Sequence, residues 1–170
     1  MPITILSISQ TEASAIIEAV IWKAMHDGGG PVAVAVVNYA GRLIAFAAMD
    51  HVMPASIKLA QSKAYSAVVG KKDTIQWAVF KKNIDTVDFD MRNWTDENFT
   101  GFTGGITIQY DDQIIGGIGV SGRKGKGDAG DLLMQDNELA EYGRSMLPVQ
   151  NTGKQTNYKK TNAENHLLKD

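Results

Sequence analysis

The chain has 170 residues, an apolar fraction of 44% and a formal net charge of −2 at pH 7. This length predicts one domain that folds without a metal or a disulfide, and the charge favours no nucleic-acid partner. The lack of cysteine excludes disulfides, thiolate nucleophiles and cysteine-based metal sites. No basic leader segment and no apolar run of bilayer length are present, so we expect a cytoplasmic protein with no membrane partner.

The first half of the chain predicts a helix, a hairpin and a second helix. Residues 9–26 carry apolar side chains at helical spacing, and Ser9 or Thr11 can cap the helix. Residues 32–39 and 42–49 flank a short turn, and the first of these strands is apolar enough to be buried on both faces. The second helix is expected over residues 55–69, after Pro54. Its expected buried face consists of Ile57, Ala60, Ala64 and Val68.

The second half predicts another hairpin and a closing helix. A short helix over 74–82 is expected to turn Trp77 and Phe80 inward, and 83–103 is a long irregular segment of the kind that forms lids or interfaces. Residues 106–110 and 113–120 form the hairpin, and 128–146 the last helix. The predicted domain covers 1–147, followed by a polar tail over 148–170. The fold class is therefore α+β, an antiparallel sheet of two hairpins with helices packed against it.

Glycines interrupt the last strand of the second hairpin. Gly116, Gly117 and Gly119 predict a bulge or a close approach of backbone. Gly117 to Gly122 also match the pattern GxGxxG. A dinucleotide site is rejected, because those glycines must lie in a strand-to-helix turn rather than in a hairpin strand.

Lys63 is the first candidate site residue. It lies one position from the expected buried face of the second helix, among small alanines. A lysine there can bind a ligand carboxylate or, with a lowered pKa, act in catalysis. The alternative is a lysine at the rim of the core whose ammonium reaches into water.

The second candidate is the loop that follows the glycine-rich strand. Ser121, Gly122, Arg123, Lys124 and Lys126 lead into a helix, so backbone N–H groups and cations could hold an anion. The alternative is a solvated charged loop. The acidic residues of the closing helix are expected to form its polar face; they are Asp128, Asp131, Asp136, Glu138 and Glu141.

The third candidate lies between the first hairpin and the second helix. His51, beside Asp50, could be a general base, a metal ligand, an axial haem ligand or simply an exposed side chain. The three histidines have no ligand spacing, so no metal site built by the protein alone is expected.

Several blocks together resemble a known family. They are PVAVAVVNYAGRLIAFAAMD, PASIKLAQSKAYSAVVG and GGITIQYDDQIIGGIGVSG, then a loop, an aspartate and a closing helix. This order is similar to that of the GlcG/HbpS family, which includes the C-terminal domain of PduO-type proteins, over about residues 10–145. The residues that match its recurring pattern are Asp50, Ser56, Lys63, Ala64, Gly104, Gly105, Gly116, Gly119, Ser121, Gly122 and Asp128. The chain departs from it at His51, where many members have glycine, and in the segment DFDMRNWTDENFTGF.

The resemblance implies a profilin-like fold, a homo-oligomer and haem as a candidate cofactor, with a haem-degrading role assigned to the family and other members found in catabolic operons. One hypothesis is a protein that binds haem or a similar ligand with carboxylate groups. Its binding residues would be His51, Lys63, Arg123, Ser121 and Gly122, with His51 or a methionine as axial ligand. The alternative is a hydrolase or isomerase of a carboxylated metabolite, with Lys63, His51 and Asp50 as catalytic residues. A non-catalytic structural or regulatory oligomer is the third, so the sequence leaves open whether the chain is an enzyme.

Overall fold

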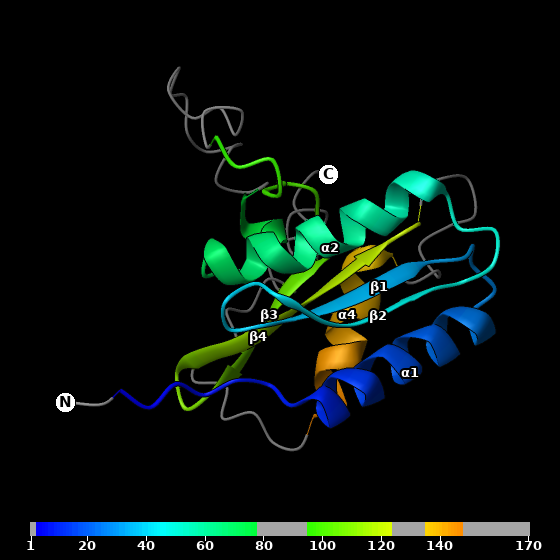
Figure 1. Ribbon diagram of the computed structural model, residues 1–170. Helices are drawn as coiled ribbons and strands as arrows, with labels where there is room; N and C mark the ends of the chain where they lie inside the picture. Colours follow the sequence, from blue (N-terminus) through cyan, green and yellow to red (C-terminus); the bar gives the residue numbers. More distant parts are fainter. Residues whose placement is uncertain (1–2, 78–94, 124–134, 148–170) are drawn as a thin grey trace, which may run out of the picture.

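The computed structural model describes residues 3–77, 95–123 and 135–147. These residues form a four-stranded antiparallel sheet with one helix on one face and two on the other (Figure 1). The expected α+β class is confirmed. The elements in chain order are α1 (Gln10–His26), β1 (Ala33–Asn38), β2 (Leu43–Ala48), α2 (Pro54–Val69), β3 (Gly105–Tyr110), β4 (Gln113–Ser121) and α4 (Asp136–Ser145).

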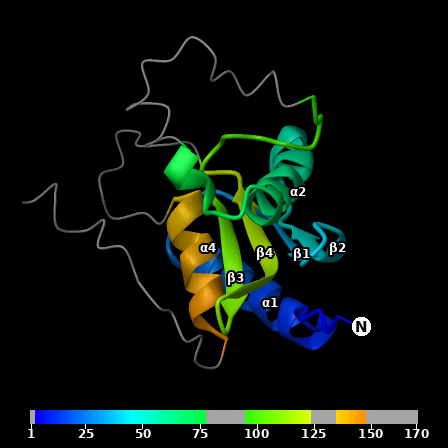
Figure 2. The ribbon, with the colours of Figure 1, turned by 90° about the vertical axis from the view of Figure 1, so that its left-hand side faces the viewer.

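The sheet has the strand order β2-β1-β4-β3, seen from its side in Figure 2. Each hairpin supplies two neighbouring strands, and the hairpins join through β1 and β4, with Val34 opposite Val120. Within the described residues, β2 and β3 are therefore the edge strands. β1 is buried on both faces for most of its length, as expected for a central strand.

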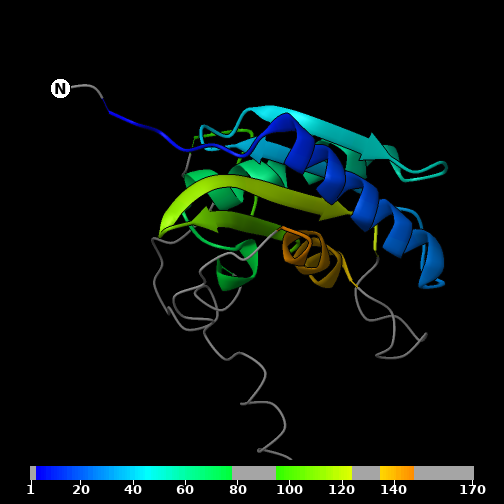
Figure 3. The same ribbon diagram turned by 90° about the horizontal axis from the view of Figure 1, so that it is seen from below.

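α1 and α4 cover the same face of the sheet (Figure 3). α1 lies against β1 and β2, and α4 lies against β3 and β4. Ile16, Val20 and Leu139 are fully buried in the core between these layers. Ser9 is the cap of α1, where its hydroxyl accepts from the Glu12 backbone N–H while the Glu12 carboxylate accepts from the Ser9 backbone N–H.

α2 covers the other face. Ala60, Ala64 and Val68 pack on the sheet as predicted, but Ile57 is 37% exposed, so its predicted burial is wrong. The buried face of α2 includes Ser56, Lys63 and Ala67 besides Ala60 and Ala64, so it is centred nearer to Lys63 than predicted and leaves Ile57 at its margin.

Part of the sequence-based description lies outside the described residues. Residues 74–77 are helical and Trp77 is buried, in agreement with the expected short helix. The expectations for Phe80, Lys124, Lys126, Asp128, Asp131, the start of the last helix and the 148–170 tail concern residues outside the described ranges.

Candidate functional site

Most helices and strands begin or end at the same end of the sheet. The register sets Ala33 opposite both Ala48 and Ser121, so β1 begins where β2 and β4 finish. β3 begins there too, with Gly105 opposite Gly119. α1 ends and α2 begins at this end, toward the right of Figure 1. We name it the β4 end, and it comprises residues 27–31, 49–54, 104–105, 120–123 and 135–136.

Lys63 lies in α2 and directs its ammonium into the β4 end. The residue is only 2% exposed. Its Nζ donates hydrogen bonds to the Val120 carbonyl oxygen at 2.8 Å and to Asp136 Oδ2 at 2.7 Å. The ammonium is therefore not in water, contrary to the alternative of a rim lysine. A buried ammonium needs such partners, because an unpaired buried charge is strongly destabilising.

Glycines in β3 and β4 allow α2 to approach closely enough to bury Lys63. A Cβ on Gly119 would lie 2.0 Å from the Ala60 carbonyl oxygen. A Cβ on Gly105 would lie 2.3 Å from the carbonyl oxygen of Lys63 itself. The close backbone approach predicted from the interrupted strand is thus confirmed, and it positions the lysine.

Burial lowers the pKa of Lys63 below that of an ordinary lysine. The charge of Asp136 and its hydrogen bond act in the opposite sense, but desolvation is the larger influence. A lysine of this kind can serve as a base or nucleophile. Here its ammonium is engaged by two oxygens, so any chemistry at Nζ must begin by loosening the pair with Asp136.

Asp136 is the site residue that sequence reasoning missed. It was expected on a polar helix face, but its side chain is 13% exposed and both carboxylate oxygens are engaged. Oδ2 accepts from Lys63, and Oδ1 accepts from the Arg123 backbone N–H at 3.0 Å. The carboxylate also lies in the first turn of α4, where the helix dipole favours negative charge. It is 73 positions from Lys63, so only the fold could pair them.

Arg123 turns its side chain away from Lys63, toward the end of α1. Its Nη2 donates to Asp27 Oδ1 at 2.8 Å and to the Ala24 carbonyl oxygen at 3.3 Å, and the side chain is 4% exposed. Nη1 lies so close to Gly29 that a Cβ there would be 0.9 Å away. Nε and Nη1 have no hydrogen-bond partner among the described residues. Arg123 is thus a buried cation with unused donors, not part of a solvated loop.

Ser121 and Gly122 shape the backbone at this end. Ser121 is the last residue of β4 and is 3% exposed. Gly122 has a φ of +145°, and a Cβ there would lie 2.3 Å from the Pro31 carbonyl oxygen. Because it has no Cβ, Gly122 lets the chain pass close to the backbone of Pro31 just before Arg123.

Asp50 and His51 lie on the turn between β2 and α2, where the Val52 N–H donates to the Met49 carbonyl oxygen at 3.2 Å. His51 is exposed and has a φ of 64°. The structure brings Lys63 and Arg123 together through Asp136, but it joins neither to His51 by a hydrogen bond. β2 and β4 are separated by β1, which is about 10 Å at the usual strand spacing.

The described residues contain no cluster of three or more His, Cys, Asp or Glu side chains that could hold a metal ion. Among the described helices, none has the length and apolar character needed to cross a membrane.

Comparison with known proteins identifies the family. The model of the haem-degrading, HbpS-like proteins matches residues 8–131. The chain belongs to the HbpS-like family. It is 34% identical over 114 residues to protein GlcG of Escherichia coli strain K12, an alignment that covers 67% of this chain and 81% of GlcG. The resemblance inferred from the sequence blocks is confirmed.

Solved structures related to the HbpS-like chain share its fold. Klebsiella pneumoniae protein ORFY has a TM-score of 0.72 at 24% identity, with 86% of this chain and 97% of ORFY covered. A complex of PduOC with haem has a TM-score of 0.72 at 22% identity, covering 85% and 97%. HbpS has a TM-score of 0.70 at 25% identity, covering 87% and 95%.

The HbpS-like match includes Lys63, His51 and Arg123 but ends before Asp136. Chemically, the β4 end offers one exposed imidazole, unused guanidinium donors and a buried ammonium–carboxylate pair. This set can bind an anionic or metal-containing small molecule more directly than it can move protons, since Lys63 is already engaged.

Proposed function

We propose that this HbpS-like chain binds haem or a similar small ligand with carboxylate groups at the β4 end. The observation that carries the proposal is the match to the haem-degrading, HbpS-like family across residues 8–131. The similarity of fold to PduOC, which was solved with haem, supports it. Haem would supply a redox-active iron and a flat apolar surface.

His51 is the residue that we propose would hold the haem iron. Its imidazole is exposed on a turn, so a ring nitrogen would be accessible to the iron without first leaving the core. Met49 and Met53 flank the same turn, and Met53 is 55% exposed, which offers an apolar or thioether contact beside it.

Arg123 is the residue we propose for a ligand carboxylate. Its Nε and Nη1 are buried donors without a partner among the described residues, and such donors are stabilised by an added acceptor. In this proposal Ser121 and Gly122 hold the backbone that positions Arg123. Lys63 holds the β4 end together through Asp136 and contacts the ligand only if that pair opens.

A haem titration followed by absorbance tests the proposal. We expect a saturable, shifted Soret band at one haem per chain, whose position changes in His51→Ala. The matched control is His26→Ala, since His26 is also exposed but stacks on Trp22 with a centroid distance of 4.5 Å. A band unaffected by His51→Ala would reject that ligand, and the absence of saturable binding would reject haem.

The second candidate function is a hydrolase or isomerase acting on a carboxylated metabolite. In it Lys63, once released from Asp136, would position the carboxylate while His51 and Asp50 move protons. Turnover that is lost in both Lys63→Ala and His51→Ala, with folding retained, would favour this enzyme over a binding protein.

Exposed apolar side chains favour self-association. Phe46 on β2, and Met53 and Ile57 at the start of α2, are 36–55% exposed. β2 is an edge of the described sheet and can pair with another chain. We therefore propose a homo-oligomer, which light scattering would reveal as a multiple of the 18.4 kDa chain mass.

A further inference from the structure

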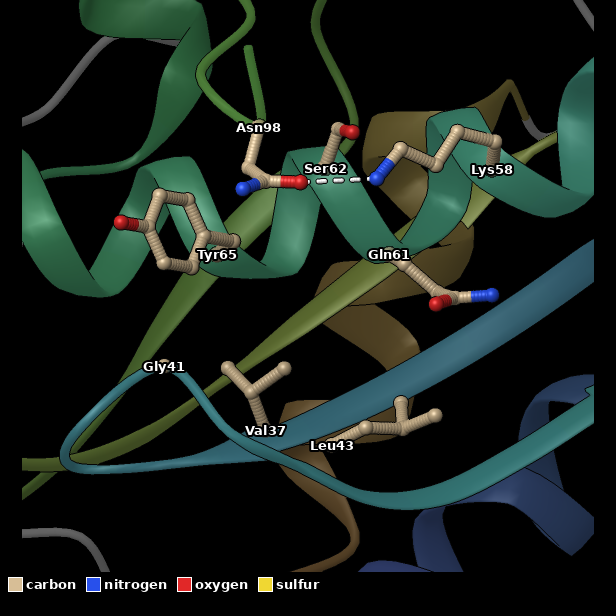
Figure 4. Close-up of a pocket in the computed structure, with 8 residues that line it drawn as sticks. All are labelled: Val37, Gly41, Leu43, Lys58, Gln61, Ser62, Tyr65 and Asn98. Carbon is tan, nitrogen blue, oxygen red and sulfur yellow. Dashed lines mark hydrogen bonds between the residues drawn. The ribbon is translucent and has the colours of Figure 1, made fainter. Parts of the chain in front are cut away.

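A pocket lies between α2 and the β1–β2 hairpin, at the opposite end of β1 from the β4 end (Figure 4). Its volume is about 240 Å³. Val37 and Leu43 form its apolar side, on the sheet. Its polar side comes from α2 and the 95–101 segment, with Lys58, Gln61, Ser62, Tyr65 and Asn98.

The polar side is held in place by hydrogen bonds around Asp96. The Tyr65 hydroxyl donates to Asp96 Oδ2 at 2.7 Å, and the Asn98 backbone N–H donates to Asp96 Oδ1 at 2.9 Å. Thr100 N–H donates to Ser66 Oγ of α2 at 2.7 Å, which fixes the same segment to the helix. The segment is thus fixed before any ligand arrives.

The Tyr65 ring closes one side of the pocket by resting on the hairpin turn. Gly41 has a φ of +74°, and a Cβ there would lie 2.7 Å from Tyr65 Cδ2. The hydrogen bond to Asp96 raises the pKa of Tyr65, and the same bond lowers the pKa of Asp96. At neutral pH the Tyr65 phenol is therefore protonated and the Asp96 carboxylate is ionised.

Lys58 is the cation of the pocket, and its partner is neutral. Its Nζ donates to Asn98 Oδ1 at 2.7 Å, and no ion pair of Lys58 occurs within the described part of the chain. Asp96 is the nearby acid: the hydrogen bond from Tyr65 lowers its pKa most, and the charge of Lys58 lowers it further, to a smaller extent. The two charges therefore attract each other, but no Lys58–Asp96 ion pair within 4.0 Å occurs among the described residues. An ammonium has three donors, so Lys58 can keep Asn98 and still donate to a further anion.

From this arrangement we propose that the pocket binds a small organic carboxylate. The carboxylate accepts hydrogen bonds from Lys58, and the apolar body lies on Val37 and Leu43. The volume exceeds the cavity of about 150 Å³ that accepts benzene, and it is below the range of about 300–1,000 Å³ typical of drug-sized ligands. The pocket therefore has room for an acid of about the size of a substituted benzene ring. This site shares no residue with the β4 end, so it does not depend on haem binding.

Titration of the ¹⁵N-labelled full chain with benzoate tests the proposal. We expect saturable amide shifts at Gly41, Leu43, Asn98 and the pocket-facing part of α2. Lys58→Gln should weaken binding about ten-fold, the usual effect of losing one charged hydrogen bond. Lys71→Gln is the matched control, because Lys71 is also an exposed lysine but does not line the pocket.

Two further measurements separate the charge from the apolar contact. Benzyl alcohol, which has the ring without the carboxylate, should bind about ten-fold more weakly than benzoate. Leu43→Asn should weaken benzoate binding and leave folding intact, since Leu43 is 49% exposed. The proposal is overturned if benzoate gives no saturable shifts at the pocket, if Lys58→Gln binds like the wild type, or if benzyl alcohol binds as well as benzoate.

Discussion

Two lysines of the same helix have opposite environments. Lys63 is 2% exposed and is paired with a carboxylate, whereas Lys58 is exposed and is paired with an amide oxygen. They are five positions apart on α2, so they point to different sides of the helix. A buried cation is therefore fully engaged by the groups that surround it, whereas an exposed cation whose hydrogen-bond partner is neutral remains available to a ligand.

Removal of each ammonium gives the largest expected difference between the two lysines. Lys63→Ala should lower the free energy of unfolding by roughly 3–5 kcal/mol, because it leaves the Asp136 carboxylate partly buried without its cation. Lys58→Ala should cost less than about 1 kcal/mol, because its hydrogen bond is exposed. Urea unfolding of both variants measures the contrast. Similar losses of unfolding free energy in the two variants would show that the pair with Asp136 contributes little to stability, which would contradict the contrast between the two lysines.

The second prediction concerns the close approach that buries Lys63. Gly119→Ala places a methyl group 2.0 Å from the Ala60 carbonyl oxygen, so α2 must move and stability should fall by roughly 1–3 kcal/mol. Gly30→Ala is the matched control, since no atom lies within 4 Å of a Cβ there. Thermal unfolding should separate the two. A Gly119→Ala protein as stable as Gly30→Ala would mean that α2 is not confined by the glycines.

The smallest expected effect is on the pH dependence of stability. The pKa of Lys63 is lower in the folded state than its usual value of 10.5. At a pH between the folded-state pKa and 10.5, the unfolded chain therefore binds more protons than the folded chain does. The free energy of unfolding should therefore rise with pH through that window, compared with Lys63→Met, which lacks this group. Urea unfolding of both proteins from neutral pH upward measures the difference. A difference that stays constant or shrinks with rising pH would contradict the lowered pKa.

Much of the fold was predictable because it is encoded locally. The apolar run in β1, the turn at Gly41 and the cap at Ser9 are signals within a few residues, and each appears in the structure close to its predicted position. The burial of Ile57 was predicted wrongly. Helical periodicity identifies a face but not how a sheet with glycines rotates the helix on it.

The sites were less predictable than the fold. Lys63 and Arg123 were singled out by residue type and neighbours, but their acidic partners, Asp136 and Asp27, were not. Each of these pairs joins residues far apart in the chain, and no spacing rule links them. The sequence does not predict the Lys58 pocket, because its polar side combines α2 with Asn98, which is 40 positions from Lys58.

The order of helices and strands, the two hairpins, the family and the glycines that require close packing can all be inferred from the amino-acid sequence. Those features depend on periodicity, turn chemistry and propensity, which act over short stretches of chain. Which charges are buried together follows instead from the packing of the folded chain. The strand register brings the start of β1 and the last residues of β2 and β4 to the same end of the sheet. There, Asp136 of α4 accepts a hydrogen bond from Lys63. Lys63 therefore stabilises the fold, whereas Lys58 faces a pocket. The two roles differ because one ammonium is desolvated and the other is not, although the residue type is the same.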